Sequence, residues 1–178
     1  MGCKIRVLIH SCCDYSYIGD SIMSQIATFK LVTTGKLDAI KNMIEEDSEK
    51  AQELCEEIDN DDDLDLSNGN CSGDVFSAIY DYLEAEHDLD FMENSEYLEL
   101  LEFWQETTEP LDVLIFTQDV AGDILAVIED TDIEEDGFTE YMDADWEINA
   151  DRAMAGLKAL RKNLQRVDAK HGLLYFLY

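Results

Sequence analysis

The chain has 178 residues, an ordinary apolar fraction of 46% and a formal net charge of −30 at pH 7. This length fits one domain with a proper core, and the apolar content excludes a wholly disordered acidic chain. A field of this sign repels DNA, RNA and anionic membranes and attracts cations and basic proteins, so direct nucleic-acid binding and membrane binding are not expected.

The negative charge is concentrated in the middle of the chain. Residues 1–36 carry +2, residues 37–147 carry −36 and residues 148–178 carry +4. The basic C-terminal stretch predicts a helix that pairs with the acidic middle. Because no signal-peptide core and no run of transmembrane length is visible, we expect a cytoplasmic protein with free thiols.

The N-terminal segments predict one strand and then one helix. Residues 3–10, "CKIRVLIH", alternate apolar and polar side chains, as in a strand. Residues 20–34 place Ile22, Ile26 and Phe29 at helical spacing and predict a helix that stops at a glycine.

Two further helices are expected before a loop. The apolar positions that they would bury are Leu37, Ile40 and Ile44 in the first and Ala51, Leu54, Cys55 and Ile58 in the second. Residues 59–73 are rich in Asp, Asn, Ser and Gly without a period, which predicts a mobile acidic loop.

The second half of the chain alternates helices and strands. Residues 74–87 and 95–106 predict helices capped by Asp74 and Ser95. The residues that these helices would bury are Val75, Ile79, Tyr82 and Leu83 in the first and Leu98, Leu101 and Trp104 in the second. Residues 111–119 predict a buried strand, and we expect residues 122–130 to pair with it as a hairpin rather than to form a helix.

The last residues complete the predicted sheet. A helix capped by Asn149 or Asp151 should bury Met154 and the leucines that follow, and residues 172–178 should form the final strand. The sequence therefore predicts a single α+β domain over residues 1–178. Its small sheet, made of N-terminal, central and C-terminal strands, would pack against about five helices.

Carboxylates recur every three or four residues and predict rows on helix faces. The first row is Glu45, Glu49, Glu53 and Glu57, and the second contains Glu99, Glu102 and Glu106. Like charges at this spacing, about 6 Å, cost a few tenths of a kcal/mol per pair. The rows resemble the phosphates along a DNA strand, so a groove that binds phosphates could accept them, with Trp104 as an aromatic anchor if its ring is exposed. A merely solvated acidic surface is the alternative.

One segment, "DIEEDGFTEYMD", nearly fits a calcium-binding loop. Its candidate ligands are Asp132, Glu134, Asp136, Phe138, Glu140 and Asp143. Three positions depart from the usual pattern: Glu134 at position three, Thr139 at eight and Asp143 at twelve. Ca²⁺ is the one cofactor candidate, and a divalent-cation-binding protein is the second hypothesis.

Catalytic signatures are few. His10, Cys12 and Cys13 follow the first predicted strand, but the acidic field would raise the pKa of a thiol rather than activate it. An enzyme that is incidentally acidic is the third hypothesis. The preferred hypothesis is a non-catalytic inhibitor that occludes the basic, nucleic-acid-binding surface of a partner. It would be a nuclease-toxin immunity protein or a DNA-mimic antagonist of a defence system, and its oligomeric state is left open.

Overall fold

The computed structural model describes residues 26–64, 66, 72–89, 96–108, 110, 112–130 and 137–178. Its elements are, in chain order, β1 (Ala27–Thr33), α1 (Thr34–Glu46), α2 (Ser48–Asp59), the 3-10 helix η1 (Asp62–Leu64), α3 (Gly73–His87), α4 (Leu98–Thr107), β2 (Asp112–Phe116), α5 (Gln118–Asp130), α6 (Phe138–Trp146), α7 (Ala150–Leu164) and β3 (His171–Leu177). The α+β class is confirmed, with seven α-helices in the described residues rather than about five. None of the helices described is long and apolar enough to cross a bilayer.

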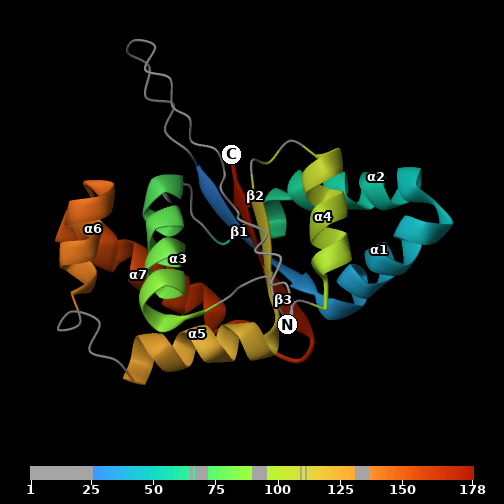
Figure 1. The fold of residues 1–178 in the computed structure, drawn as a ribbon. Coiled ribbons are helices and arrows are strands. Elements are labelled where there is room, and N and C mark those ends of the chain that lie inside the picture. Colours follow the sequence, from blue (N-terminus) through green and yellow to red (C-terminus); the bar gives the residue numbers. More distant parts are fainter. Residues whose placement is uncertain are drawn as a thin grey trace, which may run out of the picture.

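The three strands form one antiparallel sheet in the order β1-β3-β2 (Figure 1). The C-terminal strand is central, and its Tyr175 lies opposite Phe29 of β1 on one side and Leu114 of β2 on the other. The predicted central and C-terminal strands are thus confirmed. The strand predicted over residues 3–10 lies outside the described residues.

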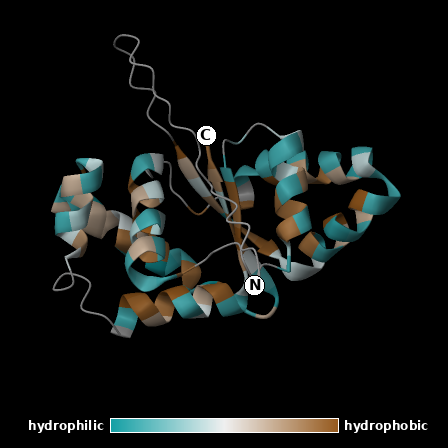
Figure 2. Cartoon of the chain, in the orientation of Figure 1, coloured by the Kyte–Doolittle hydropathy of each residue, from teal (hydrophilic) through white to brown (hydrophobic). Residues whose placement is uncertain are grey.

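Helices cover both faces of this sheet. Helices α1, α2 and α4 lie on one side, and α3, α5, α6 and α7 lie on the other (Figure 1). A hydrophobic core lies on each face of the sheet, and successive residues of β3 point into opposite cores. Tyr175 faces the α3/α7 side, whereas Leu174 and Phe176 face the α1/α4 side. Figure 2 shows the consequence, with hydrophobic strands between helices whose outer surfaces are largely hydrophilic.

The helix predicted over residues 20–34 is wrong where the structure describes it, because Ala27–Thr33 is strand β1. Both faces of this strand are covered, so its apolar residues do not show the alternation that would indicate a strand. Phe29 packs against α3 while Val32 packs under α1. The β-branched residues of "ATFKLVT" favour this extended conformation.

The predicted hairpin is also wrong, because Gln118–Asp130 is helix α5. Ala121 and Ile124 are buried in the core beneath it, three positions apart. The backbone N–H of Ala121 donates to the carbonyl of Thr117 at 2.9 Å, which closes the first helical turn directly after β2.

Several boundaries differ from the predictions. Helix α6 lies between α5 and α7, where the sequence analysis predicted no element, and it follows Gly137, whose φ of 84° is in the left-handed region that favours glycine. Helix α4 begins at Leu98, which is 40% exposed rather than buried. Ser72 rather than Asp74 occupies the N-cap position of α3. Asn149 caps α7 as predicted, since its side chain accepts from the N–H of Arg152 at 3.0 Å.

Only parts of the predicted loop 59–73 are described. Residues 59–64 complete α2 and form η1, and Leu66 N donates to the carbonyl of Phe29 at 2.7 Å. Ser72 bridges to Ile26, and Gly73 begins α3. The remaining residues of the loop lie outside the description.

Candidate protein-binding surface

Helices α1, α2 and α4, together with η1, form a surface that we call the acidic layer, residues 34–64 and 96–108. These two ranges contain sixteen Asp and Glu residues against three lysines, a net charge of −13. The apolar sides of the three helices pack on the sheet, so their polar sides are turned away from it. The acidic layer is therefore a charged helical surface on a packed core.

The first predicted row is divided between two helices. Asp47 interrupts the helical backbone with φ −158° and ψ 86°, and its side chain caps α2 by accepting from the N–H of Lys50 at 3.2 Å. Glu45 therefore lies at the end of α1, while Glu49, Glu53 and Glu57 share α2. All four glutamates are exposed. The continuous four-member row is corrected to a three-member row on α2.

The second predicted row lies on one helix. Glu99, Glu102 and Glu106 are all exposed on α4, three and four residues apart. Trp104 is completely buried, and its ring contacts that of Phe176 in the sheet with centroids 5.5 Å apart. Burial of Trp104 in the core is confirmed, so its role as an exposed aromatic anchor is excluded.

Gln52 connects the two helices that carry these rows. Its Nε2 donates to Glu56 Oε1 at 2.8 Å and to the carbonyl of Thr107, at the end of α4, at 3.2 Å. A shallow hollow of about 390 Å³ lies beside this contact and is lined by Glu53, Glu56, Glu57 and Asn60. The carboxylates of α2 thus line a concave part of the surface close to α4.

Two lysines beside this layer, Lys41 and Lys30, bind backbone carbonyls. Lys41 Nζ donates to the carbonyl of Glu96. Lys30, 4% exposed on β1, donates from Nζ to the carbonyls of Ile58 at 3.0 Å and of Asp59, which places a positive charge at the C-terminus of α2. Within the described residues, no cation pairs with the three-member row on α2 or the row on α4.

The basic C-terminal helix pairs with the acidic middle at one described contact. Arg161 Nη2 lies 2.9 Å from Glu129 Oε1 of α5, and both side chains are about half exposed. Lys158 and Lys162 are exposed on the same helix. This ion pair is on the layer opposite to the acidic layer and leaves the charge of the acidic layer unchanged.

The calcium-loop candidates are only partly described. Asp132, Glu134 and Asp136 lie outside the described residues, whereas Phe138, Glu140 and Asp143 belong to helix α6. Phe138 is fully buried, and Glu140 and Asp143 are exposed. Among the described residues no group of three His, Cys, Asp or Glu side chains is arranged to hold a metal ion. Calcium binding stays a prediction.

Some of the cysteines and histidines lie outside the described residues, and others lie within them. His10, Cys12 and Cys13 lie outside the described residues. Cys55 is buried under α2, and burial together with Glu56 and Asp59 raises the pKa of its thiol to about 12. His171 has a partner that the sequence analysis missed: Nδ1 lies 2.9 Å from Asp168 Oδ1, three residues earlier in the turn before β3.

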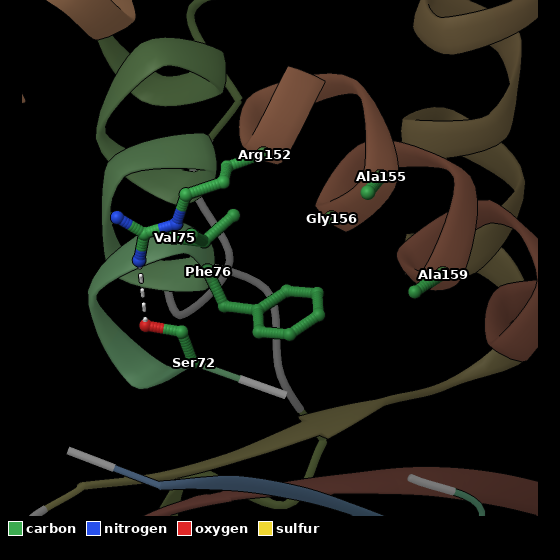
Figure 3. Close-up of a pocket in the computed structure, with 7 residues that line it drawn as sticks. All are labelled: Ser72, Val75, Phe76, Arg152, Ala155, Gly156 and Ala159. Atoms are coloured by element: carbon green, nitrogen blue, oxygen red, sulfur yellow. Dashed lines mark hydrogen bonds between the residues drawn. The ribbon is translucent and has the colours of Figure 1, made fainter. Parts of the chain in front are cut away.

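A small hollow of about 180 Å³ lies between α3 and α7 (Figure 3). Figure 3 shows Arg152 reaching from α7 to Ser72, where Nη2 donates to Oγ at 3.4 Å. Gly156 permits the close approach of the two helices, because a Cβ there would lie 2.3 Å from Val75 Cγ1. The walls are otherwise apolar, without a pair of carboxylates for acid–base catalysis.

Comparisons with protein-family models, with curated proteins and with solved structures give no match.

Proposed function

We propose that this protein is a cytoplasmic, non-catalytic binding protein whose acidic layer occludes the basic, nucleic-acid-binding surface of a partner protein. It would act as an immunity protein against a nuclease toxin or as a DNA-mimic antagonist of a defence system. The observation that carries the proposal is the pair of exposed, unneutralised glutamate rows on α2 and α4, joined through Gln52.

An acidic surface without neutralising cations costs folding free energy. Each like-charge pair one turn apart destabilises a helix by a few tenths of a kcal/mol, and lysines at intervening positions would remove this cost. Lys50 is the one lysine on α2, α4 has none, and within the described residues no glutamate of the two rows forms an ion pair. A basic groove supplies the missing cations on binding and releases the counterions that both surfaces held before.

The rows also have a spacing suited to such a groove. Successive glutamates on one helix face are about 4.5 or 6 Å apart along the axis, for steps of three or four residues, since the rise is about 1.5 Å per residue. The two helices carry their rows on a packed core, so little backbone entropy would be lost on binding. Occlusion would then be both electrostatic and steric, with association that slows as salt rises.

The test compares the wild type with the triple variant Glu49→Gln, Glu53→Gln, Glu57→Gln. The matched control is Asp119→Asn, Asp123→Asn, Asp143→Asn, which removes the same charge from exposed positions on the opposite layer. Proteins captured from a lysate of the native host at 50 mM and 500 mM KCl are identified, and the affinity of the enriched partner is measured.

The expected partner is a basic nucleic-acid-binding protein, captured at low salt and lost at high salt. The α2 variant should bind it at least tenfold more weakly than the control variant. Equal affinity of the two variants would mean that net charge alone is responsible, and enrichment of no nucleic-acid-binding protein would contradict the proposal.

A further inference from the structure

Two aromatic side chains of α6 are fixed by one carboxylate of α3. Asp81 Oδ2 accepts from Tyr141 Oη at 2.6 Å and from Trp146 Nε1 at 3.0 Å. Helices α3 and α6 lie beside each other on the layer opposite to the acidic layer (Figure 1). These three residues, which we call the Asp81 cluster, join positions 65 residues apart in the sequence.

The Asp81 cluster leaves an aromatic ring at the surface. Trp146 is 36% exposed, whereas Trp104, the other tryptophan, is fully buried. The Trp146 ring cannot rotate freely without losing its bond to Asp81, so it is oriented before any partner arrives. An oriented, partly exposed tryptophan is the type of residue that dominates the energy of protein interfaces.

The surroundings of this ring are negatively charged. Asp145 and Glu147 flank Trp146 and are exposed, as is Glu84 one turn after Asp81 on α3. Burial, the bond to Asp81 and the nearby charges of Asp81 and Asp145 raise the pKa of Tyr141, so its hydroxyl remains a donor at neutral pH. Asp81 Oδ1 accepts no hydrogen bond from the described residues and is left to bind another donor.

We propose that the Asp81 cluster is a binding site for an arginine side chain of a partner protein. The guanidinium would stack on the Trp146 indole, which is 36% exposed, and donate to Asp81 Oδ1. A planar cation suits both contacts, because it is attracted to the negative face of an indole and hydrogen-bonds to a carboxylate in the same plane. A lysine ammonium gains the charge interaction but cannot stack, so arginine is preferred.

This site does not depend on the function proposed for the acidic layer. It lies on the opposite side of the sheet, and its chemistry is recognition of a single side chain rather than neutralisation of a groove. A partner that wraps around the protein could bind both the acidic layer and the Asp81 cluster, but each proposal can be refuted without refuting the other.

The experiment uses hexa-arginine and hexa-lysine peptides at 150 mM salt as probes. Because Trp104 is buried, changes in tryptophan emission and in iodide quenching report on Trp146. The indole N–H resonance of Trp146, assigned by its loss in Trp146→Phe, gives a second readout that is followed in the wild type. Asp81→Asn and Trp146→Leu test the site, and Asp119→Asn, at an exposed position on α5, is the control for loss of one surface charge.

Hexa-arginine should shift the Trp146 resonance and bind at least fivefold more tightly than hexa-lysine. Asp81→Asn and Trp146→Leu should each weaken it at least fivefold, while Asp119→Asn changes it less than twofold. Equal binding of the two peptides, an unmoved indole resonance, or equal affinity of Asp81→Asn and Asp119→Asn would overturn the proposal, because each indicates diffuse attraction alone.

Discussion

The position of a glutamate along α2 should decide whether neutralising it stabilises the protein. Glu49 lies in the first turn of α2, where the helix dipole favours negative charge, and Glu57 lies in the last turn, where the dipole opposes it. Each has Glu53 as its neighbour one turn away. The same Glu→Gln change therefore removes one repulsion at both positions but has opposite effects on the dipole interaction.

The magnitudes follow from these two contributions. Removing one like-charge pair gains about 0.2–0.5 kcal/mol, and the dipole interaction is worth about 0.3–1 kcal/mol. Glu57→Gln should then stabilise by about 0.5–1.5 kcal/mol, whereas Glu49→Gln should lie between no change and a loss of about 0.8 kcal/mol. For a chain of this size the Tm of Glu57→Gln should rise by roughly 1 to 6 °C.

Urea unfolding at 20 mM salt, followed by circular dichroism, measures both variants without adding an ionic denaturant. At 0.5 M salt the difference between them should shrink to below about 0.3 kcal/mol, because the Debye length falls to about 4 Å. Equal stability of the two variants at low salt would mean that the helix dipole does not distinguish the two positions. A Glu57→Gln variant less stable than the wild type would mean that the acidic row does not cost stability, and either result contradicts the prediction.

Three further predictions concern buried contacts. Lys30→Met should destabilise by about 2 to 3 kcal/mol in urea unfolding, because carbonyls at the end of α2 lose a charged donor; a loss below about 0.5 kcal/mol would contradict this. Gly156→Ala should cost about 1 to 2 kcal/mol despite the better helix propensity of alanine, since the new Cβ meets Val75; stabilisation would refute the close helix contact. The raised pKa of Cys55 means that the unfolded chain loses this proton first, from about pH 9, so stability should fall between pH 9 and 12, by up to about 2 kcal/mol at pH 10.5. For Cys55→Ala the free energy of unfolding should fall less steeply over that pH range, and an equal slope would exclude Cys55 as the cause. Iodoacetamide at pH 8 should modify the Cys55 thiol only after unfolding.

The elements that were predicted correctly are those with one simple pattern of buried residues. Leu157, Leu160 and Leu164 recur at helical spacing because α7 has one buried face, and β2 is a short apolar run bounded by Pro110 and α5. Strand β1 was missed because its two faces enter different cores, which hides any alternation. Helix α5 was mistaken for a strand because it is rich in Ile and Val, residues typical of sheets.

The candidate surface was predicted in part. The glutamates of α2 and α4 occupy helix positions between the buried apolar residues, which predicts that they are exposed. The structure confirms this exposure. Two helices were expected in this region, but the row from Glu45 to Glu57 was treated as continuous, because the capping residue Asp47 lies within an acidic run and does not stand out from it. The buried position of Lys30 and the bonds from Trp146 to Asp81 depend on contacts between residues distant in the chain, which no local pattern encodes.

The central claim is that the acidic layer and a nucleic acid compete for one surface of the partner. The direct measurement is fluorescence anisotropy of a labelled nucleic acid bound to the captured partner, titrated with this protein. The account predicts complete release of the nucleic acid at one molecule of this protein per binding site. Formation of a ternary complex, with the nucleic acid still bound at saturation, would contradict it.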